Sequence, residues 1–332
     1  MRLKLVPETT KLNFFRFQKV TFGLSAIAVV ASIVLFAVVG LNYGIDFRGG
    51  SVIMTETPGP VATQEYRDLL GELEVGDATV SELRDPAAEL TGAAQYSALI
   101  RIEQQDDEDA IQNDTVQMVV NALQERFEGL TILSTESVGA KVSGELVQDG
   151  ILGVSLAVVA VLFYIWLRFE WQFALGAVAA LVHDVILTIG VFSLIGLEFN
   201  LSIIAAILTI VGYSLNDTVV VFDRVRENLR RYKKMTLKDL LNLSLNETLS
   251  RTVMTSLTTL IALSALYVLG GEVIRGFTFA MIWGVVVGTY SSVFVASPIL
   301  LRLDVKRDWS KEGDGPTEGP RKGNSKYAHI DA

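Results

Sequence analysis

Six long apolar segments, separated by polar ones, dominate the pattern along this 332-residue chain. Each predicts a membrane-spanning helix, because ~20 apolar residues in a helix cross the ~30 Å of hydrocarbon in a bilayer. The segments cover residues 20–40, 151–167, 174–196, 201–222, 253–271 and 277–301. The first apolar run passes into Leu41, Asn42 and Tyr43 without a small-residue cleavage site, so we expect an anchor rather than a cleaved signal peptide.

The longest polar segment lies between the first two apolar runs and alternates between strand and helix patterns. Strand-like alternation and 3.6-residue periodicity follow one another in the order β-α-β-β-α-β. The elements cover about residues 52–54, 63–73, 78–83, 96–102, 107–127 and 131–137. This order predicts a ferredoxin-like α+β domain outside the membrane.

Composition and charge narrow the possible function. Half of the residues are hydrophobic and the mean hydropathy is +0.41, which is typical of a membrane protein. Residues 41–150 hold 21 acidic and six basic side chains, and no dense basic face suggests a nucleic-acid partner. The chain has no cysteine and two histidines, His183 and His329, far apart, so neither a thiolate site nor a histidine-rich metal site is expected.

The distribution of basic residues predicts the orientation. Of the 28 Lys and Arg residues, 21 fall in segments on one side of the six helices and seven on the other. The side rich in basic residues is expected to face the cytoplasm. The predicted organisation is a cytoplasmic N-terminus (1–19), helix 1 (20–40), an extracytoplasmic domain (41–149), helices 2–4 (150–222), a cytoplasmic basic loop (223–250), helices 5–6 (251–301) and a disordered cytoplasmic tail (302–332).

Ionisable side chains inside membrane helices are the natural functional candidates, because burying a charge in hydrocarbon is costly. The pair His183 and Asp184 lies in the third apolar segment, and Asp217 lies in the fourth. Asp184 is either a transport residue or a carboxylate that ties helices together. Asp217 is either a functional carboxylate on a hydrated path or a carboxylate near the interface that reaches water.

The residues around Asp217 favour a hydrated path through the fourth helix. Tyr213, Ser214 and Asn216 lie within one turn of it, and Thr255 adds a further hydroxyl on the fifth helix. Arg251 begins that fifth helix, where it either belongs to a functional polar stripe with Thr255, Thr258 and Thr259 or is an arginine that reaches the interface.

Two glycine-containing patterns predict structure rather than chemistry. Gly284, Gly288 and Ser292 form part of a stripe with a small residue at every fourth position of the sixth helix, a pattern typical of close helix packing. Gly49 and Gly50 follow the first helix and predict a flexible exit from the membrane.

Several motifs together resemble one family, the SecF-type protein translocase (SecDF) subunits of the resistance-nodulation-division superfamily. Residues 44–50 resemble the signature shared by SecD and SecF, with Gly44, Asp46, Phe47, Gly49 and Gly50 at the family positions. Four further motifs are similar to the family's, and the resemblance extends from about residue 13 to 303. They lie at residues 182–184, 212–228, 250–256 and 288–292.

The resemblance implies a function, partners and roles for individual residues. A SecF-type subunit pairs with SecD, associates with the SecYEG channel and its accessory subunits, and helps move unfolded preproteins across the bacterial inner membrane. It uses the proton-motive force and needs no cofactor. By motif, Asp217 matches the family's membrane aspartate for proton coupling and Arg251 its charged partner, with Asp184 as the next candidate.

The number of helices supports a partner independently. Full-length transporters of this superfamily carry twelve helices in two similar halves, each with a large outer loop. This chain has six predicted helices and one such loop, so a second chain is expected to supply the other half.

Two competing functions share the same helices. One is a half-size proton-driven exporter of small molecules. The other is an intramembrane aspartyl protease with Asp184 and Asp217 as its dyad. The Gly-x-Gly-Asp sequence typical of such proteases is absent, because Ser214, Leu215 and Asn216 precede Asp217.

Overall fold

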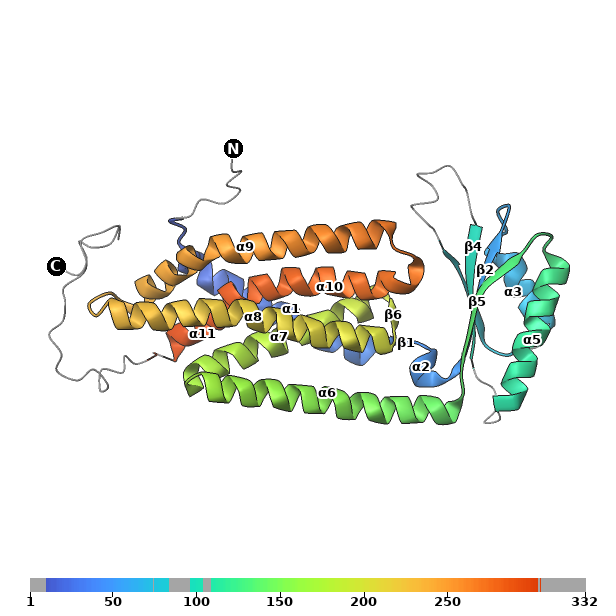
Figure 1. Cartoon of the computed structure of the whole chain (residues 1–332), viewed down its shortest axis with the longest axis horizontal. Helices are drawn as coiled ribbons and strands as arrows, with labels where there is room; N and C mark the ends of the chain where they lie inside the picture. The colour runs from blue at the N-terminus through green and yellow to red at the C-terminus, as the bar shows by residue number, and fades with distance from the viewer. Residues whose placement is uncertain (1–9, 74, 84–95, 104–108, 304, 306–332) are drawn as a thin grey trace.

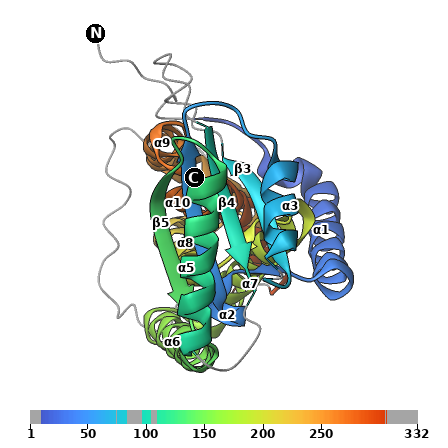
Figure 2. The same cartoon turned by 90° about the vertical axis from the view of Figure 1, so that its right-hand side faces the viewer.

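The computed structural model describes residues 10–73, 75–83, 96–103, 109–303 and 305. A bundle of long helices forms one part, and a small sheet covered by two helices lies beyond one end of the bundle (Figure 1). Viewed along the bundle, α6 and α9 stand at opposite edges, and α8 and α10 lie between them (Figure 2).

Six helices in the described part of the chain are long and apolar enough to cross a membrane, as predicted. Their centre is formed by α7, α8 and α10, whereas α1, α6 and α9 bury few of the residues in their apolar segments. The bounds of the first five spans are α1 (Gln18–Val39, preceded by η1, Phe14–Phe17), α6 (Ala140–Arg168), α7 (Trp171–Ile195), α8 (Leu201–Arg231) and α9 (Leu237–Leu269). The sixth is made of α10 (Glu272–Ser291), η2 (Ser292–Ala296) and α11 (Ser297–Arg302).

Three of these helices extend well beyond the apolar segments that predicted them. The segment 223–250, predicted as a loop, is largely helical, because α8 continues to Arg231 and α9 begins at Leu237. Thr236 caps α9, since its Oγ1 accepts from the backbone N of Asp239 at 3.2 Å and donates to the Asp239 carboxylate at 2.6 Å. Likewise, α6 begins at Ala140, before the predicted start at residue 150. Hydropathy marks where side chains leave the hydrocarbon, whereas backbone hydrogen bonding decides where a helix ends.

The sixth span contains one wide turn. Residues Ser292–Ala296 are π-helical, and Ser297 Oγ donates to the Ser292 carbonyl at 3.0 Å. Pro298 follows directly, and because proline has no N–H and its ring clashes with the preceding turn, it disfavours regular α-helix there. Wide turns of this kind often occur at functional sites.

The segment between α1 and α6, called the outer domain here because of the orientation predicted from the sequence, is the predicted ferredoxin-like α+β unit. Its sheet has the order β3-β4-β2-β5 with every neighbouring pair antiparallel, and α3 and α5 cover one face. The side chains of Ile53, Ile100 and Leu123 are fully buried between sheet and helices. The elements are β2 (Gly50–Thr57), α3 (Thr63–Glu72), β3 (Ala78–Leu83), β4 (Tyr96–Ile102), α5 (Asp109–Arg126) and β5 (Thr131–Val138).

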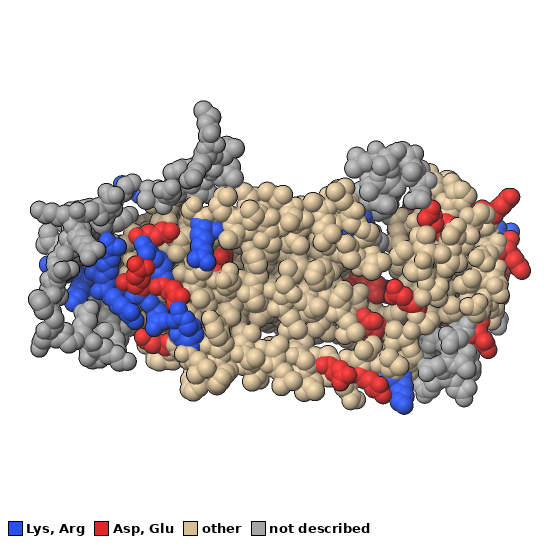
Figure 3. Space-filling view, in the orientation of Figure 1, with Lys and Arg blue, Asp and Glu red and all other residues tan. Residues whose placement is uncertain are grey.

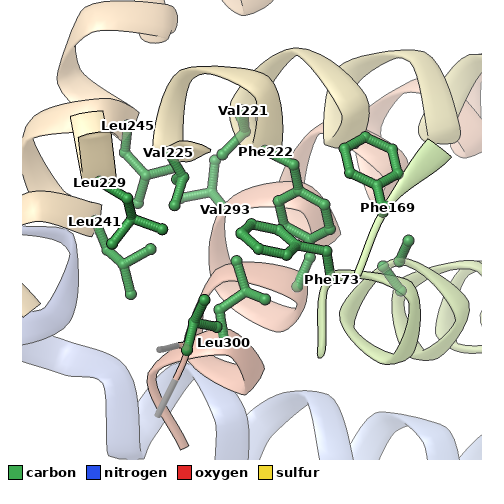
Figure 4. Packing of buried hydrophobic residues seen from close by; sticks show 14 of the residues in the cluster. Phe169, Phe173, Val221, Phe222, Val225, Leu229, Leu241, Leu245, Val293 and Leu300 are labelled. Carbon is green, nitrogen blue, oxygen red and sulfur yellow. The ribbon is translucent and has the colours of Figure 1, made fainter. Parts of the chain in front are cut away.

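An apolar core stabilises the end of the bundle that lies away from the sheet. Phe173 and Phe222 meet edge to face with ring centroids 5.3 Å apart, and Phe169 stacks beside them (Figure 4). Leu241 and Leu245 of the helical extension of α9 are buried in the same cluster. The predicted cytoplasmic segment is therefore packed onto the membrane bundle.

The first residues that the structure describes, before α1, are hydrogen-bonded to α9. The Asn246 amide accepts from the backbone N of Leu12 at 2.8 Å and donates to the Leu12 carbonyl at 2.8 Å. It also accepts from the Thr10 hydroxyl at 2.6 Å. The segment before α1 therefore lies against the extension of α9.

Candidate functional site

The Asp184 carboxylate lies at the point where α7, α8 and α10 meet. Its side chain is fully buried. Oδ2 accepts from the hydroxyls of Ser214 on α8 at 2.6 Å and Ser291 on α10 at 2.8 Å. Asp184 therefore ties three helices together, which is one of the two roles considered from the sequence.

The same carboxylate is linked to α1 through a histidine and a tyrosine. His183 Nδ1 lies 2.9 Å from Asp184 Oδ1, and the imidazole stacks on Tyr290 with ring centroids 6.2 Å apart. Tyr290 donates to the Thr21 carbonyl and lies 3.0 Å from the Ser25 hydroxyl of α1. A polar layer thus crosses the bundle at this level.

Asp217 is also buried, but its surroundings differ. Its side chain is 4% exposed, and Oδ2 has no hydrogen-bond partner among the described residues. The Thr252 side chain of α9 lies next to this carboxylate, and Arg251 of the same helix is near enough for its charge to act on it. The Thr252 hydroxyl is itself buried without a hydrogen-bond partner in the described part of the chain. An under-bonded carboxylate thus faces α9.

The residues expected to form one polar path with Asp217 lie in different places. Ser214 donates to Asp184, and the Tyr213 hydroxyl is buried without a hydrogen-bond partner in the residues described. Asn216 is exposed on the surface of the single chain. Thr255 is exposed as well, and its hydroxyl donates to the backbone carbonyl of Thr252 at 2.9 Å.

Arg251 is near enough for its charge to act on Asp217, but the two form no ion pair among the described residues and the Arg251 side chain is exposed. The next residue, Thr252, points inward, and one turn later Ser256 lies 2.7 Å from the Thr289 hydroxyl of α10. The polar residues of α9 that face the bundle are therefore Thr252 and Ser256, each one position after the predicted Arg251 and Thr255.

The small-residue stripe of the sixth span faces α8 of the same chain. A Cβ added to Gly288 would lie 3.0 Å from the Ser214 Cβ, and one added to Gly284 would overlap the Ile210 side chain. The Ser292 and Thr218 hydroxyls lie 3.1 Å apart. Close packing of α8 against α10 thus depends on the absence of side chains at the two glycines.

The signature after α1 forms a joint between the bundle and the outer domain. The two-residue strands β1 (Asn42–Tyr43) and β6 (Glu198–Phe199) pair in parallel. Gly44 donates its N–H to the Phe199 carbonyl at 2.9 Å, and a Cβ at this glycine would overlap the Glu198 carboxylate. Asp46 accepts from the backbone N of Leu201 at 2.9 Å and so caps the start of α8.

The remaining signature residues determine how the chain leaves the joint. After α2 (Ile45–Arg48), Gly49 and Gly50 have φ angles of +73° and +124°, in a region that strongly favours glycine. Phe47 packs its ring against Phe199 and Tyr43, with centroids 6.0 Å apart in both pairs. The glycine pair therefore directs β2 into the sheet through a defined turn.

A cleft of about 650 Å³ lies at this joint, between the open face of the sheet and the ends of the membrane helices. Arg101 of β4 forms an ion pair with Glu198 across it. Burial raises the pKa of Glu198; Arg101 acts in the opposite direction, and the nearby acids Asp46 and Glu136 raise the pKa further.

The sequence pattern placed His183 beside Asp184 among the candidates, but it did not single out Ser291, Thr252 or the Arg101–Glu198 pair as site residues. Ser291 could have been identified from the sequence, because it belongs to the motif at 288–292 and follows Gly288 of the small-residue stripe. The ion pair joins residues 97 positions apart, and only the fold brings them together.

Comparisons with known proteins agree with this architecture. Residues 118–306, more than half of the chain, match the family described as protein export membrane protein SecD/SecF, C-terminal. Residues 34–53 match the SecD/SecF GG motif, which spans the joint with Gly49 and Gly50. The protein translocase subunit SecF of Rhodobacter capsulatus is 53% identical over 317 residues, covering 94% of each chain. The chain belongs to the SecD/SecF family.

Two further relatives of the SecF-type chain are longer proteins. The protein translocase subunit SecDF of Brucella abortus is 42% identical and is matched over 94% of this chain but 40% of its own length. The crystal structure of SecDF, a translocon-associated membrane protein from Thermus thermophilus, matches with a TM-score of 0.79 and 32% identity, over 92% of this chain and 40% of that one. This chain therefore spans less than half of each SecDF protein.

Family membership decides between the functions considered from the sequence. This is a multi-pass membrane protein of a protein-transport family, a SecF-type translocase subunit of the Sec pathway and not an enzyme. The structure agrees that Asp184 and Asp217 do not form a protease dyad: among the described residues, Asp184 is bonded to serines and His183 rather than to Asp217. No group of three or more His, Asp or Glu side chains in the described ranges could hold a metal ion.

Proposed function

We propose that this SecF-type chain acts with SecD to complete the translocation of preproteins through the SecYEG channel, driven by the proton-motive force. The partnership is supported by the SecDF relatives, of whose length this chain matches 40%. The proposed setting is the bacterial inner membrane with both termini in the cytoplasm. Figure 3 supports this orientation, because Lys and Arg gather at the end of the bundle away from the sheet.

The observation that carries the proposal is the buried, under-bonded carboxylate of Asp217. In a helix bundle such a group is stable either as the neutral acid or as the anion next to a cation. Arg251 is the cation available on the facing helix, and its side chain is exposed and thus free to approach or withdraw. Movement of Arg251 would therefore release or capture a proton at Asp217.

The fold offers a route from this site to the outer domain. Asp217 lies on α8, and α8 begins at Leu201, whose N–H is bound by Asp46 of the joint. A rigid shift of α8 would therefore move the joint and the sheet attached to it. The wide turn at Ser292, bonded to Thr218, gives the adjoining span a place where the helix can adjust.

Asp184 has a different role in this proposal. Its bonds to Ser214 and Ser291 connect α7 and α10 to the segment of α8 that precedes Asp217. The Asp184 cluster would transmit a shift of α8 to its neighbours, and it would become the coupling group only if Asp217 does not titrate.

The proposed function is tested by preprotein uptake into membrane vesicles depleted of SecD and SecF. Adding this chain together with SecD should restore stimulation of uptake by a proton gradient, and each alone should not. An ionophore that collapses the proton gradient should abolish the gain. A gain that persists without SecD, or that follows a sodium gradient instead, would contradict the proposal.

A further inference from the structure

A recess lined only by charged side chains lies at the end of the bundle away from the outer domain. It is formed where α6 ends and α8 continues beyond the membrane segment, and its volume is about 540 Å³. The lining residues are Arg168, Asp223, Arg226, Glu227, Arg230 and Arg231. None of them takes part in the proton-coupling proposal.

The two acids of this recess, hereafter the arginine recess, are already engaged by arginines. Asp223 accepts from Arg168 at 2.6 and 2.7 Å through both oxygens and lies 4.0 Å from Arg226. Glu227 accepts from Arg224, which lies outside the recess, at 2.6 Å. Four arginines against two acids leave the recess with an excess of positive charge.

The excess charge resides on Arg230 and Arg231. Both side chains are exposed, and neither forms an ion pair with any residue that the structure describes. Arg231 packs over the Tyr232 ring at 5.4 Å. Two guanidinium groups that pair with no carboxylate in the described part of the chain, next to an arginine cluster that is already ordered, fit an anion with several oxygens, such as a phosphate.

The level of the arginine recess relative to the membrane is marked by aromatic side chains. Trp166 and Trp171 lie within three residues of Arg168 and are 66% and 60% exposed. Exposed tryptophans of membrane proteins gather at the height of the lipid headgroups. Phe163 and Leu167 on the last turns of α6 are also more than half exposed, and such apolar surface is suited to acyl chains.

We propose that the arginine recess binds the phosphate of an anionic phospholipid. The phosphate contacts Arg230 and Arg231, and the acyl chains lie along the exposed apolar surface of α6. Stacking of Arg168 and Arg226 on the Phe169 ring, at 5.1 and 5.8 Å, orders the opposite wall of the recess. A basic pocket between membrane helices at headgroup height is a known form of lipid site.

The test measures phosphatidylglycerol binding to the full-length chain in nanodiscs or micelles of neutral phosphatidylcholine. The double variant Arg230→Gln and Arg231→Gln loses no ion pair among the described residues, so it should fold as the wild type does. Its affinity for phosphatidylglycerol should fall roughly tenfold or more, as expected when charge-assisted contacts worth at least ~1.4 kcal/mol are lost. Lys234→Gln with Lys238→Gln removes the same charge from exposed residues outside the recess, and this control should bind like the wild type.

Three outcomes would overturn the proposal. The arginine variant could bind phosphatidylglycerol as tightly as the wild type, or the lysine control could lose as much affinity as the arginine variant. Glycerol phosphate without acyl chains could bind as tightly as the lipid, which would identify a soluble phosphate as the ligand.

Discussion

Ser291 of α10 donates a hydrogen bond to the fully buried carboxylate of Asp184 on α7, at 2.8 Å. Replacing it by alanine leaves a buried carboxyl group with one hydrogen-bond donor fewer. We expect Ser291→Ala to lower the free energy of unfolding by about 1–2 kcal/mol, between the values for bonds to charged groups and for bonds in membrane bundles. Thermal unfolding in mild detergent measures the loss.

The control for this prediction is Ser202→Ala. Ser202 is exposed, and its hydroxyl bonds to Asn200 on the surface of the joint. Its removal should change the melting temperature little. Equal melting temperatures for the Ser291 variant and the control would show that the Asp184 cluster does not stabilise the bundle.

Close packing of α8 against α10 predicts the effect of side chains at the stripe glycines. Gly288→Leu and Gly284→Ala should each cost about 1–3 kcal/mol, because the added atoms meet Ser214 or Ile210 in a packed interface. Gly276→Ala on the same helix is the matched control, since its Cβ would lie 3.5 Å from Ile203, an ordinary contact. Unchanged melting and membrane yield for both stripe variants would refute this account of the stripe.

The Arg101–Glu198 ion pair gives a pH-dependent prediction for the joint. The side chains are 15% and 30% exposed, so their ion pair should stabilise the fold more than a pair on the open surface does. A double-mutant cycle with glutamine at both positions should therefore give a coupling energy of about 1–2 kcal/mol at pH 8. The coupling should vanish on acidification, and it should do so above the ordinary titration range of glutamate, because burial raises the pKa of Glu198.

The sign of the net stability change follows from the same raised pKa. The folded chain holds the Glu198 proton more tightly than the unfolded chain, so this group's contribution to stability falls as the pH rises through that pKa. Relative to Glu198→Gln, the wild type should thus become more stable as the pH falls through that pKa. Melting curves at a series of pH values decide the point. A pH profile identical in both chains would remove Glu198 as the titrating group.

Much of the fold could be predicted because it depends on patterns within single segments. Six apolar runs predicted six helices, and alternation in the outer segment predicted the order of its strands and helices. The helical nature of 223–250 could not be read in this way. Its stability comes from the Thr236 cap and from burial of Leu241 and Leu245 on the bundle rather than from hydrophobicity along a span.

The sequence predicted which residues belong to the candidate site, but not which of them lie together. Asp184, Asp217 and Ser214 were recognised as polar positions in apolar helices. In the structure the two carboxylates are not bonded to each other, and Ser214 donates its hydrogen bond to Asp184 rather than to Asp217. Which polar side chains meet depends on the rotation of each helix about its axis, and that rotation is decided by packing such as Gly288 against Ser214.

The orientation remains a prediction and can be tested with introduced cysteines, because the chain has none of its own. Gln124 on α5 and Lys234 between α8 and α9 are both exposed. A cysteine at Gln124 should react with an impermeant thiol reagent added outside intact spheroplasts, and one at Lys234 should react only after lysis. The reverse pattern would place the termini outside.

The central claim is that a proton at Asp217 couples the gradient to export. Asp217→Asn keeps the size and hydrogen-bonding capacity of the side chain but removes its titration, and Asp184→Asn does the same at the other buried carboxylate. Arg251→Met should fail like Asp217→Asn, whereas Asp217→Glu retains a titrating carboxyl and should keep part of the activity.

The most direct measurement is preprotein uptake into vesicles containing SecD and each variant, with and without a proton gradient. The account predicts that Asp217→Asn assembles with SecD but gains nothing from the gradient, while assembled Asp184→Asn keeps at least part of the gain. Full stimulation in Asp217→Asn vesicles, with loss confined to Asp184→Asn, would contradict it and identify Asp184 as the coupling residue.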